Sequence, residues 1–460
     1  MKRLSAFFIL CMAIAYYNHT YAAWTPQFET PRIISRPSPS KEYNSNLTYP
    51  VDILVGYSGA VYVTWKGDLD YKGYRIVSTD KGQTWSQPIA FTHDTTSNFH
   101  LTEAPDGMLV ATYNGTPTSH PDGYNHFYVR KSPDKGATWG APELVDTTPA
   151  QSDEHAFGHV PAIDANGTLY VVYAVRTLAG TSNTAGFYLM RYNAATGQWT
   201  PPVQLVPTML AYDAIPRFTT QFGKTILTLT GYYAPNGVDR AQAVGVLNAH
   251  GEFNFTFFSE PSAVIETCGP ISAPKCDPCS NEAAPRAGAD ARGNLYVLAD
   301  FIEKTATFDP STCSRIVNTL ASGTWVRRYS AADCPLEPSI VLSSTPGEQK
   351  ALASAGDGYA VVFYREGLTS STSHMMAMSG SSLDSCSGAT YWGTPVQIDD
   401  EATRDKKNPV SAVGPDGTIY VLWELWVNGV LGRVGFTSSI GPAKAQFPTV
   451  IHSLLLDADR

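Results

Sequence analysis

The sequence predicts an all-β protein made of a repeated, radially arranged unit, and two repeats in the chain predict it. An eight-residue turn of pattern S-x-D-x-G-x-T-W occurs at 78–85 and again at 132–139. A strand-like motif that begins at a glycine occurs seven times. The chain shows no helical periodicity of comparable strength, so strands account for its periodic part.

The eight-residue turn combines residue types that form turns with one that anchors them. Asp hydrogen-bonds its own backbone and Gly supplies a positive φ. The Trp two places after the Gly can enter a core as an aromatic anchor. Two copies 54 residues apart indicate a structural repeat.

The glycine-initiated motif predicts buried strands. Each copy is a Gly followed by a run of β-branched, aliphatic and aromatic residues, which is typical of a strand buried on both faces. Turn formers such as Pro-Asp-Gly or Ala-Asn-Gly precede several copies. The copies occupy 59–65, 107–113, 167–173, 223–229, 293–299, 358–364 and 417–423.

The intervals between these glycines run from 48 to 70 residues. One buried strand per interval leaves room for three more, and four antiparallel strands per radially repeated unit make a β-propeller. Seven copies predict seven blades. The fourth copy matches least well, so six blades is the alternative. Residues 198–202 and 391–395 read as outermost strands, and 24–26 is expected to pair with the last blade and close the ring.

The N-terminus predicts export. Lys2 and Arg3 precede an apolar run from 4 to 15, and a small-residue cleavage site follows at 20–22, ending at Ala22. This is the pattern of a cleaved signal peptide, and the run is too short to span a bilayer. We expect residues 1–22 to be removed and the protein to be secreted or periplasmic. Residues 23–460 are then one propeller domain with a Cys- and Pro-rich inserted loop at 266–280, and no other stretch reads as a membrane span.

Composition narrows the class of partner. The formal charge of the chain is −9, and loss of the two cations in the signal peptide makes it −11. An acidic chain lacks the basic surface of a nucleic-acid binder. Aromatic residues at 12% and charged residues at 16% fit a β-rich protein that faces carbohydrate.

Six cysteines remain after the signal peptide, all in the C-terminal half: Cys268, Cys276, Cys279, Cys313, Cys334 and Cys386. An even number in an exported chain favours disulfides. Cys276 and Cys279 could instead supply two ligands of a zinc site. No cofactor is predicted, and a structural zinc or calcium ion stays open.

The polar residues around the repeated strands are the candidate site. In a propeller, the loops that lead into the innermost strands line the central funnel, and function has to be argued from those residues. Six of the ten histidines fall between 93 and 159. The candidates for substrate binding are His126, His155, Arg217, Glu282, Arg286 and Arg404.

The S-x-D-x-G-x-T-W turn resembles the Asp-box of the sialidase-like β-propellers. Within that superfamily, residues 95–200 resemble the propeller polysaccharide lyases of the ulvan-lyase kind. The resemblance places their functional residues at His100, His120, Tyr173 and Arg191, with His126 as the competitor of His120.

The resemblance implies β-elimination of a uronate-containing anionic glycan. His100 and Tyr173 would be the acid/base pair, while His120 and Arg191 would neutralise the uronate carboxylate.

Two other functions remain open. An exo-sialidase would use Arg217, Arg286 and Arg404 on a sialate carboxylate, with Glu282 beside them. However, the Arg-Ile-Pro motif of sialidases is missing where 49–52 reads Tyr-Pro-Val-Asp. A non-catalytic lectin would use exposed aromatic surfaces, for which Trp65, Trp423 and Trp426 are the candidates.

Overall fold

The structure is a computed structural model of the full chain. It describes residues 27–34 and 51–440 except for the following gaps: 68–71, 93–95, 116–125, 146–153, 178–185, 194–195, 208, 211–215, 222–223, 234–239, 249, 260–285, 290–294, 309–314, 330–339, 344–349, 356–358, 367–372, 382–390, 400–404 and 428–429. The predicted signal peptide, the 266–280 loop and all six remaining cysteines lie outside the described residues.

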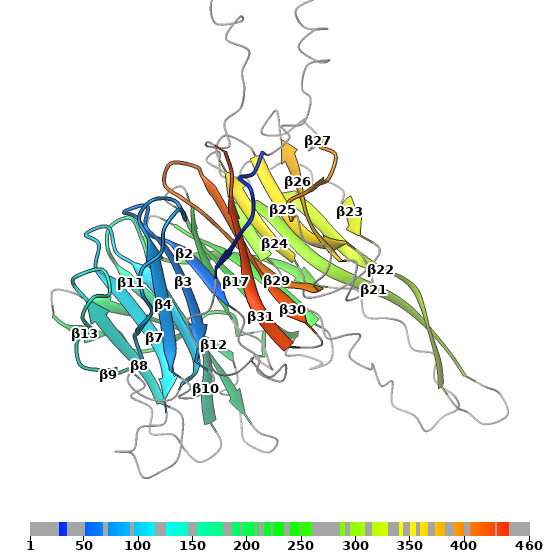
Figure 1. The fold of residues 1–460 in the computed structure, drawn as a ribbon. Coiled ribbons are helices and arrows are strands. Elements are labelled where there is room, and N and C mark those ends of the chain that lie inside the picture. The colour runs from blue at the N-terminus through cyan, green and yellow to red at the C-terminus, as the bar shows by residue number, and fades with distance from the viewer. Residues whose placement is uncertain are drawn as a thin grey trace, which may run out of the picture.

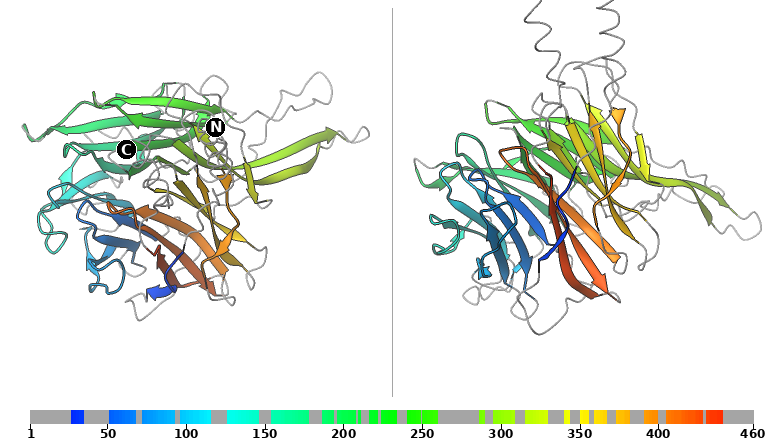
Figure 2. Two further views of the ribbon diagram at one scale, coloured as in Figure 1. Left: turned by 90° about the horizontal axis from the view of Figure 1, so that it is seen from above. Right: turned by 45° about the horizontal axis from the view of Figure 1, so that its top comes forward.

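The described strands form seven antiparallel sheets that follow one another around a common centre (Figures 1 and 2). We number the sheets along the chain. Sheet 1 holds β2 (Asp52–Val55), β3 (Val61–Lys66), β4 (Gly73–Ser78) and β5 (Ile89–Ala90). Sheet 2 holds β6 (Thr96–Glu103), β7 (Leu109–Gly115), β8 (His126–Ser132) and β9 (Glu143–Leu144).

Sheets 3 to 5 continue the pattern. Sheet 3 holds β10 (Glu154–Ile163), β11 (Leu169–Thr177), β12 (Gly186–Asn193), β13 (Gln198–Trp199) and β14 (Val203–Gln204). Sheet 4 holds β15 (Met209–Leu210), β16 (Arg217–Gln221), β17 (Lys224–Tyr233), β18 (Arg240–Leu247) and β19 (Phe253–Ser259). Sheet 5 holds β20 (Arg286–Ala289), β21 (Leu295–Phe308), β22 (Arg315–Tyr329) and β23 (Ile340–Ser343).

Sheets 6 and 7 complete the described fold. Sheet 6 holds β24 (Lys350–Ala355), β25 (Tyr359–Glu366), β26 (His374–Ser381), β27 (Tyr391–Trp392) and β28 (Val396–Gln397). Sheet 7 holds β29 (Asp405–Val413), β30 (Ile419–Val427), β31 (Val430–Ser438) and, at its outer edge, β1 (Arg32–Ile34). The prediction of an all-β propeller with four-stranded antiparallel units is confirmed. Among the described residues there is no apolar helix that could cross a membrane.

The described residues of the apolar runs in the seven glycine-initiated repeats form the second strand of each sheet, from β3 in sheet 1 to β30 in sheet 7. A second strand has a neighbour on each side and a sheet against each face, so its residues are fully buried, as Val61 and Val171 are. The innermost strand is the one before it. Four of the polar residues that were expected before the repeats therefore lie within innermost strands: His100, His155, Arg217 and Arg286.

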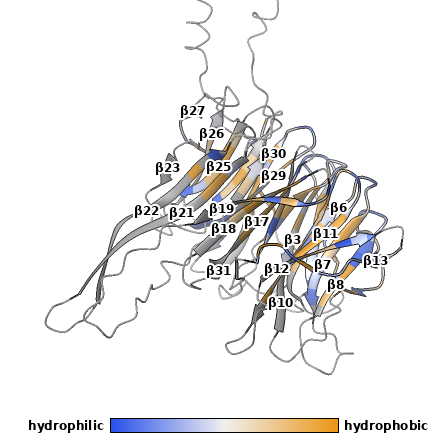
Figure 3. Ribbon diagram, turned by 180° about the vertical axis from the view of Figure 1, so that it is seen from behind, coloured by the Kyte–Doolittle hydropathy of each residue, from blue (hydrophilic) through white to orange (hydrophobic). Residues whose placement is uncertain are grey.

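The hydrophobic core lies between neighbouring sheets. One cluster joins Val172 of sheet 3 to Leu229 of sheet 4, and another joins Phe363 of sheet 6 to Trp423 of sheet 7. Figure 3 shows the hydrophobic residues running along the packed strands, for example β11, β17 and β25. Trp423 is 2% exposed, so it packs in the core and offers no surface to a sugar.

The N-terminal segment closes the ring by pairing with sheet 7. Strand β1 runs antiparallel to β31, with Ile33 opposite Gly435, and the Ile440 backbone N–H donates to the Gln27 carbonyl at 2.8 Å. The expectation that the N-terminus pairs with the last sheet is confirmed. The paired residues are 32–34, whereas the expected 24–26 lies outside the described residues.

Both S-x-D-x-G-x-T-W turns connect the third and fourth strands of their sheets and have the same hydrogen bonds. In the first, the Gly82 backbone N–H donates to Ser78 Oγ at 2.7 Å, and the Thr84 hydroxyl donates to Asp80 Oδ2 at 2.6 Å. Gly82 has a φ of 86°. Trp85 then packs edge-on against Phe436 of sheet 7, with ring centroids 5.3 Å apart. The turn thus joins the first and last sheets.

The Asp-box carboxylates predict a specific loss of stability in acid. Hydrogen bonds from the Thr84 and Thr138 side chains and backbones lower the pKa values of Asp80 and Asp134 from 3.8 to about 2. A lowered folded-state pKa stabilises the protein above pH 3.8, and this contribution is lost as the pH falls towards 2. The melting temperature of an Asp80→Asn/Asp134→Asn variant should therefore fall furthest below that of the wild type above pH 4, and the difference should shrink towards pH 2.

Thr84→Val is the matched variant for this experiment, because it keeps the carboxylate and removes its strongest donor. It should move the acid loss of stability to higher pH. A melting-temperature difference that stays constant from pH 6 to pH 2 would contradict the assignment.

Candidate functional site

The innermost strands of all seven sheets line one central cavity with a volume of about 450 Å³. Because every sheet presents the same strand to the axis, residues far apart in sequence meet here. The lining includes one residue or more from each sheet: Asp52, His100, Val160, Arg217, Ala287, Leu352 and Ser411.

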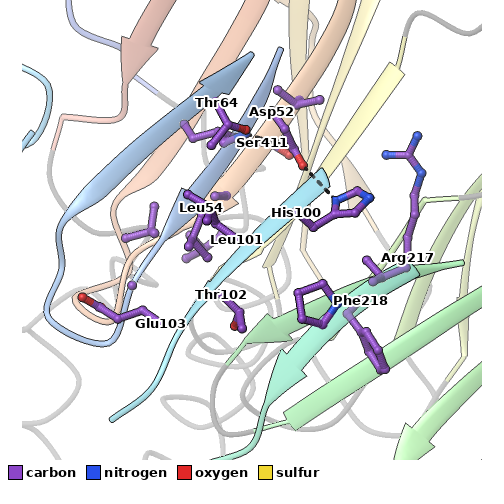
Figure 4. Close-up of a pocket in the computed structure, with 18 of the residues that line it drawn as sticks. Asp52, Leu54, Thr64, His100, Leu101, Thr102, Glu103, Arg217, Phe218 and Ser411 are labelled. Atoms are coloured by element: carbon purple, nitrogen blue, oxygen red, sulfur yellow. Dashed lines mark hydrogen bonds and ion pairs between the residues drawn. The ribbon is translucent and has the colours of Figure 1, made fainter. Parts of the chain in front are cut away.

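A charged cluster occupies one end of the cavity. Asp52 of β2, His100 of β6 and Arg217 of β16 lie together there (Figure 4). Asp52 Oδ2 is 3.8 Å from His100 Nδ1, and the side chains are 46% and 21% exposed. The Ile53 backbone N–H donates to Asp52 Oδ1 at 2.9 Å and fixes the carboxylate.

The electrostatics of this cluster keep Asp52 ionised. Burial by itself would raise the pKa of Asp52, but the charge of His100, 3.8 Å away, and the charge of Arg217 lower it below its ordinary value. A carboxylate facing one imidazole nitrogen selects the tautomer and orientation of the ring. Here His100 Nδ1 faces Asp52, which leaves Nε2 as the ring nitrogen without a contact to the carboxylate. Nε2 is buried and has no hydrogen-bond partner among the described residues.

The opposite end of the cavity is closed by a second carboxylate, Glu103 (Figure 4). Glu103 is 2% exposed. It accepts hydrogen bonds from the Ser58 backbone N–H at 3.0 Å, the Ser58 hydroxyl at 2.9 Å and the Tyr62 hydroxyl at 3.0 Å. Burial, followed by the Glu103 charge, raises the pKa of Tyr62, so the phenol remains a donor. These bonds give the cavity a rigid floor.

A second histidine, His159 of β10, is buried within reach of the charge of His100. It is 2% exposed, and its Nδ1 is 2.7 Å from Asn114 Oδ1, which joins sheets 2 and 3. Its ring stacks on Phe127 with centroids 3.8 Å apart. Burial, and then the charge of His100, holds the pKa of His159 well below its ordinary value. His159 is therefore neutral near pH 7 and adds no charge beside His100.

Two residues of the predicted quartet, Tyr173 and Arg191, are not among those that line the cavity. Tyr173 lies on a second strand, is 7% exposed and stacks between His159 and Tyr188, with centroids 5.7 Å from each. Arg191 lies on a third strand, where neighbouring strands are about 4.8 Å apart. Its guanidinium donates to the Gly251 carbonyl and lies over the Tyr170 ring, so it joins sheets 3 and 4.

The structure therefore brings His100 and Arg217 together and keeps Tyr173 and Arg191 apart from them. His126 begins β8, a third strand, while His155 and Arg286 lie on the innermost strands β10 and β20. His120, Glu282 and Arg404 lie outside the described residues.

Sequence reasoning missed two cavity residues, Asp52 and Glu103. Asp52 stands where sialidases carry the Arg-Ile-Pro motif, and a single carboxylate before a strand has no local pattern that marks it as functional. Glu103 directly precedes a turn and resembles an ordinary solvated residue in sequence. Among the residues that the structure describes, no cluster of three or more His, Cys, Asp or Glu side chains could hold a metal ion.

No family model matches the sequence, and no curated protein matches it. Solved structures do. An α-L-arabinofuranosidase of Fusarium graminearum complexed with arabinobiose is 13% identical, with 90% of this chain and 98% of that one covered and a TM-score of 0.46. A polysaccharide lyase, an ulvan lyase, is 10% identical, with coverage of 91% and 96% and a TM-score of 0.45. A mutant of Trypanosoma rangeli sialidase displaying trans-sialidase activity is 13% identical, with coverage of 90% and 60% and a TM-score of 0.39.

The chain has a β-propeller fold with two Asp-box turns. Its radial four-stranded sheets and the hydrogen-bonded Asp-box turns carry that statement. At identities of 10–13%, the similarities to solved structures concern the fold alone.

The cavity floor yields a stability prediction at Gly56. A methyl group at this position would overlap Glu103 Oε2 and force the carboxylate away from Ser58 and Tyr62. Gly56→Ala should lower the free energy of unfolding by about 1–3 kcal/mol, measured by urea denaturation.

The control for Gly56→Ala is a double-mutant cycle with Glu103→Ala. Since the overlap needs the carboxylate, Gly56→Ala should cost much less in the Glu103→Ala background. If the losses in the free energy of unfolding were additive, the overlap with Glu103 would not be the reason that Gly56→Ala destabilises the protein.

Proposed function

We propose that this chain is an exported carbohydrate-active propeller that binds an anionic glycan in its central cavity and cleaves it by β-elimination beside a uronate. The observation that carries the proposal is the Asp52–His100–Arg217 cluster at one end of the cavity. It combines a guanidinium, an imidazole with a free nitrogen and an ionised carboxylate behind that imidazole.

Each group of the cluster fits one demand of the reaction. The Arg217 guanidinium can pair with the uronate carboxylate and stabilise the negative charge that develops there. His100 Nε2 can take the proton from the carbon next to that carboxylate. Asp52, 3.8 Å from Nδ1, stabilises the imidazolium that results.

In this elimination, His100 alone can carry the proton from the sugar carbon to the leaving oxygen. The electron pair of the broken C–H bond becomes the new C=C bond, and the C–O bond to the neighbouring sugar breaks. The proton on Nε2 then passes to the departing oxygen. The products are an unsaturated uronate and a free sugar hydroxyl.

A non-catalytic glycan-binding propeller is the second candidate function. The positions of Tyr173 and Arg191 favour it, because two of the four residues that the lyase resemblance implies have structural partners instead. The same cavity would then bind an acidic sugar without proton transfer. An exo-sialidase would need Arg286 and Arg404 beside Arg217. Among the described residues that line the cavity, Arg217 is the one arginine.

We also infer that the seven sheets are the seven blades of a single ring. The packing of β29 of sheet 7 on β2 of sheet 1 supports this. Export through a signal peptide at 1–22 and the single domain at 23–460 remain part of the proposal.

Activity is tested by incubating the mature protein with a panel of uronate polysaccharides and following the ultraviolet absorbance of the unsaturated product. His100→Ala should lower kcat by about 10²–10⁴-fold, because it removes the proton carrier. Arg217→Ala should raise KM and lower kcat, because its cation acts on the bound carboxylate and on the transition state.

Tyr173→Phe is the discriminating variant. Its ring stacking survives loss of the hydroxyl, so activity should be largely retained. Loss of activity in Tyr173→Phe with full activity in Arg217→Ala would contradict the cluster assignment. Glycan binding by the wild type without any product would instead favour the lectin.

A further inference from the structure

We propose that the junction between sheets 6 and 7 is a second anion subsite, which binds the carboxylate of a uronate flanking the sugar in the cavity. This inference rests on the proposed function, because it requires an acidic polysaccharide. The subsite consists of Arg365, Lys407 and Trp426, held by Asp405 and Glu424. We call these five residues the junction subsite.

The junction subsite lies on the same edge of the ring as the Asp52–His100–Arg217 cluster. Lys407 is near the beginning of the innermost strand β29, just as Asp52 is at the beginning of β2. Three residues further along β29, Val410 lines the cavity. Because the strand bulges between these two residues, Lys407 lies at most roughly 10 Å from Val410 along the strand. A polysaccharide leaving the cavity can therefore pass over the junction.

The charges at this junction are layered, with the cations outside. Asp399 and Lys406 form a buried ion pair at 3.0 Å, with side chains 2% and 0% exposed. Above them, Asp405 is 10% exposed, while Arg365 is 18% and Lys407 is 31% exposed. Among the charged residues of the junction subsite, the two cations are thus more exposed than the carboxylate that holds them.

The outer cations are held in place before any ligand arrives. Arg365 Nη2 is 2.7 Å from Asp405 Oδ1, and its Nε has no hydrogen-bond partner among the described residues. The Lys407 Nζ lies 3.5 Å from Asp405 Oδ2 and 4.6 Å from the centre of the Trp426 ring. Pre-ordered side chains lose less entropy when they bind.

Trp426 is itself anchored, which keeps the ring under Lys407. Its Nε1–H donates to Glu424 Oε2 at 2.8 Å, and the Asn408 amide donates to the same oxygen at 2.9 Å. Glu424 Oε1 also accepts the Val51 backbone N–H at 3.3 Å. Because Val51 precedes Asp52, the junction subsite and the cavity cluster share one rigid support.

Lys407 is the residue that can exchange partners. Its ion pair with Asp405 is longer than that of Arg365 and its side chain is more exposed, so the pair contributes little free energy. An incoming carboxylate can bind the ammonium at small cost, while Arg365 keeps Asp405 neutralised.

The chain offers a matched control lysine away from the cavity. Lys131 Nζ is 3.4 Å from Glu143 Oε2 and 3.7 Å from the centre of the Tyr192 ring, and its side chain is 27% exposed. It therefore has the same kind of partners and exposure as Lys407. However, it lies on the third strand β8, next to the Asp-box turn.

The experiment measures the dissociation constants of a glucuronate disaccharide and a glucuronate hexasaccharide by calorimetry, in a His100→Ala background that prevents cleavage. Lys407→Gln should raise the dissociation constant of the hexasaccharide by about threefold to tenfold and leave that of the disaccharide unchanged. Lys131→Gln should change neither, and Lys407→Arg should restore hexasaccharide binding. Thermal denaturation checks that each variant is folded.

Equal effects of Lys407→Gln and Lys131→Gln on the hexasaccharide would overturn the subsite and leave the proposed function standing. An equal loss of affinity for both oligosaccharides in Lys407→Gln would also overturn the subsite, since the lysine would then act on the cavity itself. If the His100→Ala parent protein, with both lysines intact, binds neither oligosaccharide, the proposed function fails and the subsite fails with it.

Discussion

The packing of each sheet against the faces of two neighbours is the constraint on which the rest of the structure depends. It makes the second strand of every sheet a buried element, as the fully buried Val61, Val171 and Val421 show. It also leaves the outer edge of the last sheet in need of a partner, because unpaired strand edges expose backbone donors and acceptors. Strand β1 pairs with that edge, and the Trp85–Phe436 contact joins the sheets at the same seam.

The same constraint creates the candidate site. Each innermost strand has one paired side and one side towards the axis, so its polar residues face those of other sheets. Asp52, His100 and Arg217 come from three different sheets and meet at one end of the cavity. Two further carboxylates, Glu103 and Glu424, are buried and hydrogen-bonded. Glu103 fixes the opposite end of the cavity, and Glu424 accepts the backbone N–H of Val51 next to Asp52, so the site is pre-organised for a charged ligand.

The sequence was sufficient for the elements whose signal is local. The Asp-box turns could be predicted because Ser78, Asp80, Gly82 and Thr84 make their hydrogen bonds to one another. The buried strands could be predicted because seven runs of apolar residues recur at similar intervals. His100 and Arg217 could be named as candidates from their place before such runs.

Tertiary structure alone decided which of these polar residues meet. Asp52 and Arg217 are 165 residues apart, and no local pattern connects them. Tyr173 was expected at the site, but it lies on a second strand, where side chains pack between sheets. A strand's side chains alternate between its two faces, and whether any of them can reach the axis depends on the strand's place in its sheet. That place is set by long-range packing, which the order of residues along a single strand does not encode.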